Sequence, residues 1–444
     1  MTAPATRRGF SAEAVAELVR RRDEPDWMRQ RRLDAWQTYE RLPMPTRQDE
    51  EWRRTDLRDL KLDEVAPFAD GHNGRTPRGT LLPEAERHEQ LGGFLGLRDG
   101  HPVEHRLDDA LRAKGVIFTD LATAVREHGD LVREHFMTRV VPAGDSKFAA
   151  LHGAFWDNGT FLYVPKGVAV ELPFRAVVAA GHQGSASMAH TLIVLDEQAQ
   201  ATFAEDFTSP EGTAGGFSSR VTEIILGQEA NLRYVGVQRW GKTVHDFHTE
   251  RALLGRDATV VLETVELGSA LSKGRVEAVF AGDGGNAKIL GLYIEDGRQH
   301  LDRYTLQDHR AANCTSDLLF KGVLTDKARS VFSGLIRVAP NARKTAAYQQ
   351  NRNLLLSRAA RADSIPNLEI GCNDILGCTH GATVGKVDEE QLFYLMCRGL
   401  TRSDATHLIV EGFVDPLVAA VPIAGLRDAL RSEIQRRVSA QDIQ

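Results

Sequence analysis

The sequence predicts a mainly β protein whose core is a parallel β-helix, or β-solenoid, flanked by α-helical segments at both ends. Between 148 and 370, short β-prone runs alternate with turn residues. Within this region a turn followed by a small apolar residue recurs at 168, 199, 230, 258 and 287, with spacings of 31, 31, 28 and 29 residues. A repeat near 30 residues that contains no helical pattern is typical of stacked coils of strands.

The alternative to a solenoid is a large β-sandwich or barrel. In such folds turn signals come about every 8–12 residues, and the turns within each repeat are not far from that spacing. The longer period favours the solenoid, and we assign residues 146–380 to it.

Residues 1–145 are predicted to form a mainly helical N-terminal domain. Ser11 is a good N-cap residue, and Val15 and Leu18 begin an apolar helix face. A second helical pattern contains Trp27, Leu33 and Trp36. Both helices need an apolar surface on which to pack.

Residues 381–444 are predicted to form a helical C-terminal domain. Asp388 and Gln391 have the spacing of a capping box, and Gly399 supplies a helix stop. Thr401 begins a second helix. A third helix is predicted from apolar residues four apart: Leu426, Leu430, Ile434 and Val438.

Composition and charge exclude several classes of protein. A net charge of −6 and a pI near 6.2 give no large basic field for nucleic acid. The apolar run at 408–426 is broken by Glu411 and Asp415, so we expect no membrane span. The N-terminus has no apolar segment typical of a secretory signal, and only four cysteines occur. We therefore expect a cytoplasmic protein without a disulfide framework.

The stretch GCNDILGCTHGATVG at 371–385 holds the most chemically distinctive residues. Cys378 and His380 are a thiol and an imidazole two residues apart, and zinc and iron prefer both as ligands. The spacing does not make a four-ligand site within one chain, so a metal site here would be a partial one, completed by another chain or by solvent. The alternative is a glycine-rich connection between two domains, with Cys372 and Cys378 as small packing residues.

Other histidines give weaker indications of a metal site. His245 and His248 lie three apart in a β-prone run, so their side chains should point to opposite faces. His300 and His309 have no fixed relation. The sequence also lacks the recognised motifs of hydrolases, zinc proteases and NTPases, and we expect a protein that is not an enzyme.

Several segments closely resemble the SufB/SufD family of iron–sulfur cluster assembly proteins: KGVLTDKARSVFSGLIRVAPNARKTAAYQQNRNLLLS, SIPNLEI, CTHGATVG and DEEQLFYLMCRGLTRSDATHLIVEGF. The resemblance implies a right-handed parallel β-helix with helical domains at both ends. It also implies a complex in which SufB and SufD pair through their β-helices, and each binds the ATPase SufC through its C-terminal helices. On this basis the residues expected to dock the ATPase are Leu392, Phe393, Leu408, Ile409 and Phe413.

Within the family the chain looks most like SufD. SufB-type sequences carry a cysteine near the position of Ala360 and a glutamate at that of Gly381. The resemblance gives His380, with Cys378 beside it, a part in holding a transient iron–sulfur cluster shared with a SufB-like paralogue. The alternatives are a SufB-like scaffold acting as a homodimer and a β-helix enzyme acting on carbohydrate.

Overall fold

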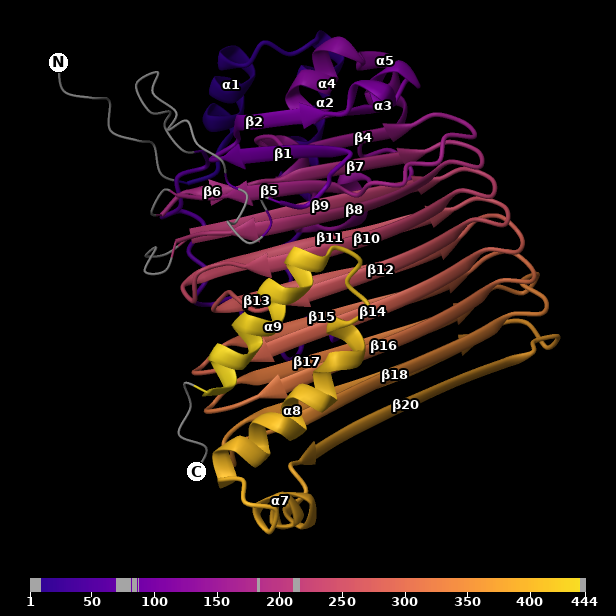
Figure 1. Cartoon of the computed structure of the whole chain (residues 1–444). Coiled ribbons are helices and arrows are strands. Elements are labelled where there is room, and N and C mark those ends of the chain that lie inside the picture. Colours follow the sequence, from indigo (N-terminus) through magenta and orange to yellow (C-terminus); the bar gives the residue numbers. More distant parts are fainter. Residues whose placement is uncertain are drawn as a thin grey trace.

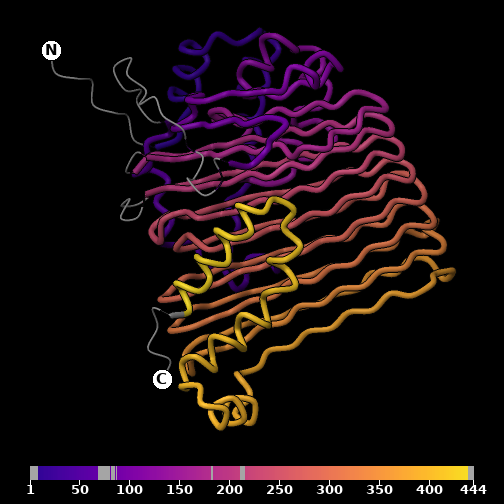
Figure 2. Tube along the Cα trace, viewed as in Figure 1, coloured from indigo at the N-terminus to yellow at the C-terminus, as the bar shows by residue number. Residues whose placement is uncertain are grey.

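Two sheets of ten strands each form the walls of a long solenoid (Figure 1). The structure is a computed structural model that describes residues 9–68, 81, 86, 88–181, 184–210 and 216–439. From β7 onward the chain passes from one sheet to the other with each successive main strand, so that two strands make one coil, and consecutive coils lie side by side along the axis (Figure 2). The predicted parallel β-solenoid is confirmed, and the sandwich or barrel is wrong.

From β8 onward the even-numbered strands belong to the first sheet. Its neighbours are parallel except for the hairpin of β1 and β2. In spatial order it consists of β2 (His101–Leu107), β1 (Gly93–Arg98), β5 (Phe174–Ala179), β8 (Gln200–Thr208), β10 (Asn231–Arg239), β12 (Thr259–Glu266), β14 (Asn286–Glu295), β16 (Thr315–Leu324), β18 (Ala346–Leu355) and β20 (Gly377–Lys386).

The second sheet carries the strands between them. It is parallel except where β3 meets β4. In spatial order it consists of β19 (Arg361–Ile370), β17 (Arg329–Val338), β15 (His300–His309), β13 (Leu271–Phe280), β11 (Val244–Leu254), β9 (Gly216–Leu226), β7 (His190–Leu195), β4 (Thr160–Val164) and β3 (Ile117–Asp120), while β6 (Ala186–Ser187) pairs with β9.

The turns that enter the first sheet repeat the same backbone conformation. Each of the turns that lead into β5, β8, β10, β12, β14, β16 and β18 contains a residue with positive φ, a conformation for which glycine, asparagine and aspartate are best suited. The predicted small residues follow these turns, and Ala199, Ala230 and Ala258 are buried at equivalent places. Ala287 is not at that place, because Asn286 pairs with Thr259 and Gly285 therefore precedes the strand. The positive-φ residues are Gly167, Gln198, Glu229, Asp257, Gly284, Asn313 and Lys344.

The N-terminal segment covers one end of the solenoid and part of its second sheet. Helices α1 (Ala12–Arg21) and α2 (Asp26–Arg41) pack with α6 (Lys147–Phe155) on Phe217 and Phe247. Ser11 caps α1 by accepting from the Ala14 amide at 3.2 Å, as predicted. Short elements follow: η1 (Glu50–Trp52), α3 (Asp109–Ala113), α4 (Leu121–Glu127), α5 (Gly129–His135) and η3 (Ala143–Asp145).

The segment assigned to a mainly helical domain at 1–145 also contributes strands. β1, β2 and β3 extend the two sheets of the solenoid, so this part of the chain is continuous with the core rather than separate from it. The two N-terminal helices are where the apolar spacing placed them. The stretch from 42 to 65 within this predicted helical domain holds only the 3-10 turn η1.

The C-terminal segment returns along the first sheet. Helices α8 (Arg402–Val418) and α9 (Ala424–Ser439) lie across its outer face (Figure 1) and bury residues such as Val410 and Leu430 against Val235 and Leu292. Helix α7 (Glu389–Met396) lies beyond the last coil. Asp388 and Thr401 cap α7 and α8 as predicted, by accepting from the Glu390 and Asp404 amides at 2.9 and 3.1 Å.

Candidate functional site

Cys378 and His380 lie on β20, the last strand of the first sheet. The alternative predicted for this stretch, a glycine-rich connection between two domains, is wrong. Gly377, Gly381 and Gly385 all lie within the strand, and none of the three has positive φ. The strand continues to Lys386, across the boundary predicted at residue 380.

Both side chains are on the inward-facing side of β20. Cys378 pairs in register with Ala347 and His380 with Gln349, and parallel register partners point to the same side of a sheet. Ala347 and Gln349 are 6% and 0% exposed because β20 covers them. No further coil follows β20 in the first sheet, so His380 is exposed while occupying a position that is interior in every earlier coil.

The thiol of Cys378 is half-buried. It packs at the edge of a small apolar cluster that includes Ile336, Val338 and Cys372. Burial raises the pKa of the Cys378 thiol, so the free side chain is mostly protonated at neutral pH. A thiolate at this position therefore needs a metal ion or a nearby positive charge for its stabilisation.

The other cysteines occupy different environments. Cys372 is 6% exposed within the apolar cluster, and Cys314 is 0% exposed inside the solenoid, where burial raises its thiol pKa. Cys397 is exposed at the end of α7. All four are free thiols.

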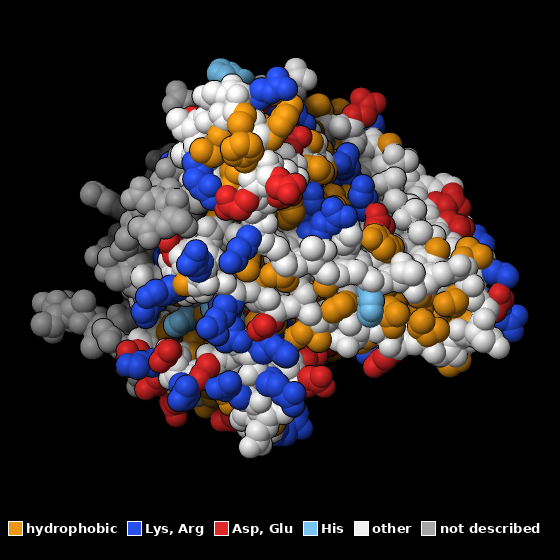
Figure 3. All heavy atoms as spheres, turned by 90° about the horizontal axis from the view of Figure 1, so that it is seen from below, with side chains coloured by type: hydrophobic (Ala, Val, Ile, Leu, Met, Phe, Trp, Pro, Cys, Tyr) orange, Lys and Arg blue, Asp and Glu red, His pale blue; other side chains and the backbone are white. Residues whose placement is uncertain are grey.

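The end of the solenoid around Cys378 has the features of an interaction surface. Strands β19 and β20 are the outermost strands of their sheets, so each has one edge of backbone groups without a neighbouring strand. Three large apolar side chains, Ile370, Leu376 and Val384, are 43%, 71% and 43% exposed there. Viewed onto this end, hydrophobic side chains gather among charged ones (Figure 3). An exposed strand edge beside apolar side chains is suited to pairing with another chain.

The residues predicted to dock the ATPase divide into two groups. Phe393 and Leu408 are 68% and 50% exposed, and Tyr394 and Met396 extend this apolar surface. Leu392 is 2% exposed and Phe413 packs against the cluster beneath α8, so these two hold the helices in place instead of presenting surface. Ile409 is half-buried.

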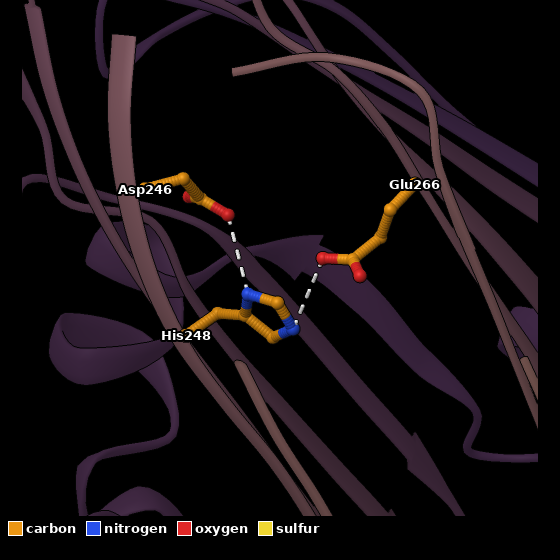
Figure 4. A group of neighbouring side chains, drawn as sticks. All are labelled: Asp246, His248 and Glu266. Carbon is orange, nitrogen blue, oxygen red and sulfur yellow. Dashed lines mark hydrogen bonds and ion pairs between the residues drawn. The ribbon is translucent and has the colours of Figure 1, made fainter. Parts of the chain in front are cut away.

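A buried polar group lies deeper in the solenoid and was not predicted. Asp246 and His248 on β11 lie next to Glu266 on β12, and each can offer a ligand atom within 4.8 Å of the others. The imidazole lies between the two carboxylates (Figure 4), with Nδ1 3.2 Å from Asp246 Oδ2 and Nε2 3.5 Å from Glu266 Oε1. As expected, His245 and His248 do not share a face, because they lie three residues apart on β11.

The pattern of β11 could have indicated this group. Asp246, His248 and Glu250 alternate along the strand, so all three must face the same side. Their partner Glu266 is 18 residues beyond His248, in the other sheet, and no local pattern relates the two. Among the residues that the structure describes, no other group of three or more potential ligands has its ligand atoms within 4.8 Å of one another.

Comparison with known proteins assigns the chain to a family. Residues 177–413 match the family described as SUF system FeS cluster assembly, SufBD core domain, and residues 100–176 match the SufBD protein N-terminal region. The matched core spans most of the solenoid and reaches into α8. Within the described residues, no helix is long and apolar enough to cross a membrane.

Individual relatives match over nearly the whole length. The iron–sulfur cluster assembly protein SufB of Bacillus subtilis (strain 168) is 31% identical over 430 residues, which cover 94% of this chain and 90% of the relative. An iron–sulfur cluster assembly SufBD family protein of Staphylococcus haemolyticus (strain JCSC1435) is 31% identical over 429 residues, with the same coverage. The chain therefore belongs to the SufBD family of iron–sulfur cluster assembly proteins.

Proposed function

We propose that the chain is a SufD-like, non-enzymatic subunit of an iron–sulfur cluster assembly complex. The observation that carries the proposal is the incomplete pair of ligands, Cys378 and His380, at the open end of the solenoid. One thiol and one imidazole do not hold an iron–sulfur cluster, which takes about four protein ligands. A second chain placed against this end would supply the others.

The partner is a SufB-like paralogue that pairs with β19 and β20. The free strand edges and the exposed side chains of Ile370, Leu376 and Val384 support this arrangement. Pairing would cover these side chains and bring ligands of the partner to His380. The cluster is then transient and shared, and the isolated chain holds none tightly.

The ATPase of the system, SufC, docks at the exposed surface of α7 and α8. Phe393, Tyr394, Met396 and Leu408 form it, and α8 packs directly on the first sheet. A displacement of these helices can therefore move the first sheet, whose last two strands are β18 and β20. Nucleotide-driven movement in the ATPase would reach the ligand pair by this route. A reducing compartment such as the cytoplasm fits the four free cysteines.

The assignment to SufD over SufB depends on two positions. Ala360 precedes β19 and Gly381 follows His380, whereas SufB-type sequences have cysteine and glutamate at these places. A relative named SufB is similar over nearly the whole chain, so a SufB-like scaffold acting as a homodimer is a second candidate. Light scattering with and without the paralogue separates the two, because a SufD-like subunit forms a heteromeric complex in preference to its own dimer. The family descriptions give no support to the carbohydrate-active alternative.

The test is reconstitution of the complex with its paralogue and ATPase, followed by anaerobic cluster assembly. We expect His380→Ala to reduce the cluster yield at least fivefold while leaving the complex assembled. His101→Ala, which changes an exposed histidine on β2 at the far end of the same sheet, is the matched control. A normal yield from His380→Ala would remove the role given to this residue.

A further inference from the structure

The interior of the solenoid contains ionisable side chains where an apolar column would be expected. Asp246, His248 and Glu250 on β11 are 0%, 4% and 1% exposed, and all three face inward. Burying charge without a partner costs several kcal/mol, so such residues are retained only where other groups or ligands compensate them.

The imidazole of His248 has one nitrogen with a partner and one without. Nδ1 donates to Asp246 Oδ2 at 3.2 Å. Nε2 makes no hydrogen bond, and it faces Glu266 Oε1 at 3.5 Å. When Nδ1 carries the proton of this hydrogen bond and the ring is neutral, the lone pair of Nε2 points at a carboxylate oxygen, and a cation between the two atoms would relieve their repulsion.

The separation of these two atoms fits a shared metal ion. N–H to O hydrogen bonds are usually about 2.9–3.0 Å long, so 3.5 Å is a poor hydrogen bond. Two ligands that each lie about 2.1 Å from one tetrahedral ion are about 3.4 Å apart. Asp246 meanwhile holds the opposite side of the ring, as carboxylates commonly do for metal-bound histidines.

A glycine on the neighbouring strand leaves space for the imidazole of His248. Gly274 on β13 pairs in register with His248, and a Cβ at 274 would lie 2.4 Å from Nε2. No side chain from this position can therefore occupy the space next to the ring.

Charged side chains around Asp246, His248 and Glu266 affect how strongly a cation can bind there. Arg220 donates to Asp246 at 3.1 and 2.8 Å and lies 3.9 Å from Glu250, while Arg303 contacts Glu266. Trp240 adds a neutral donor to Asp246, and the Ser272 hydroxyl lies 3.4 Å from Asp246 Oδ2 and 3.3 Å from Glu266 Oε1, so it can donate to either carboxylate. The two guanidinium groups offset much of the negative charge of the carboxylates, so a cation binds more weakly here than at a site free of arginine.

We propose that His248 Nε2 and Glu266 Oε1 bind a divalent first-row transition-metal ion inside the solenoid, with Asp246 orienting the imidazole. One nitrogen and one carboxylate oxygen favour ions such as Mn²⁺, Fe²⁺, Co²⁺ or Zn²⁺ over Mg²⁺ and Ca²⁺, which prefer oxygen ligands alone. This inference rests on the geometry of the chain and is independent of its proposed role in cluster assembly.

The experiment uses the isolated full-length chain with Co²⁺ as the probe. The starting variant is Cys378→Ser with His380→Ala, so that the pair at the open end does not contribute. Visible absorption reports Co²⁺ in a protein site, and the melting temperature at about 1 mM Co²⁺ reports binding to the folded state. Glu266→Gln and His248→Gln remove the two ligands. His309→Gln is the matched control, because His309 is also 0% exposed in the interior and donates to or accepts from Ser316 at 2.8 Å.

We expect one Co²⁺ per chain in the starting variant and in His309→Gln, with a rise in melting temperature in both. Glu266→Gln and His248→Gln should weaken binding at least tenfold and abolish the rise. Glu266→Gln decides the question if His248→Gln does not fold. The proposal is overturned if the starting variant shows no saturable binding, or if Glu266→Gln binds as the starting variant does. Neither result bears on the role of His380.

Discussion

Gly274 and His248 are register partners on β13 and β11, and a Cβ on Gly274 would lie 2.4 Å from the imidazole. The imidazole therefore fits in its observed position only because residue 274 has no side chain.

Gly274→Ala should destabilise the protein by about 1–3 kcal/mol, because an added methyl group must displace a buried ring. Urea unfolding followed by circular dichroism measures the change. Gly385→Ala is the control, since no atom lies within 4 Å of a Cβ built at that strand position. Equal stability of the two variants would show that the coil relaxes around the extra methyl group.

Phe393→Asp should weaken binding of the ATPase subunit at least tenfold. Phe393 is 68% exposed on α7, and large aromatic residues at the centre of an apolar surface usually dominate the binding energy. Surface plasmon resonance with immobilised ATPase measures the affinity. Met44→Asp changes another exposed apolar residue, 38% exposed and in the N-terminal segment, and should bind normally. Unchanged binding by Phe393→Asp would place the docking surface elsewhere.

Glu263 should make stability depend on pH. It lies on the outer face of β12 between Val235 and Leu290, beneath α8 and α9, and both its oxygens lack a hydrogen-bond partner. Burial raises the pKa of this carboxyl to about 8. Because the folded state holds the proton that the unfolded chain releases near its ordinary pKa, stability falls as pH rises from about 4.5 to about 8.

Glu263→Gln removes this dependence, since an amide does not titrate. The stability of the variant relative to the natural protein should grow with pH by up to about 1.4 kcal/mol per pH unit between pH 5 and 8. Thermal or urea unfolding across this range measures it. Glu171→Gln, which changes an exposed carboxyl, should keep the pH dependence of the natural protein. A constant difference between Glu263→Gln and the natural protein would contradict the raised pKa.

The sequence anticipated the elements whose signals are local. The corners at Ala199, Ala230 and Ala258 recur because each coil needs the same turn, and the N-caps Ser11, Asp388 and Thr401 satisfy helix amides within three residues of themselves. The structure of the glycine-rich stretch 371–385, in contrast, depends on a contact between distant segments. A glycine in an edge strand and a glycine in a loop have the same local pattern, and only the pairing of β20 with β18 distinguishes them.

The surface available to partners also required the structure. Leu392 and Phe393 are adjacent and both apolar, but one is 2% and the other 68% exposed. A helix buries only the face turned toward its neighbours, and the direction of that face depends on where α7 and α8 meet.

The sequence alone determined that this chain is a solenoid with helical ends and that Cys378 and His380 are its most distinctive potential ligands. Periodicity, capping and turn chemistry act over a few residues or repeat at a fixed interval, so they can be read along the chain. The tertiary structure alone decided that Cys378 and His380 face inward at an open end, and that His248 meets Glu266 inside the solenoid. Those contacts join different strands or sheets, and their geometry is fixed by register and by the stacking of coils, which no local pattern encodes.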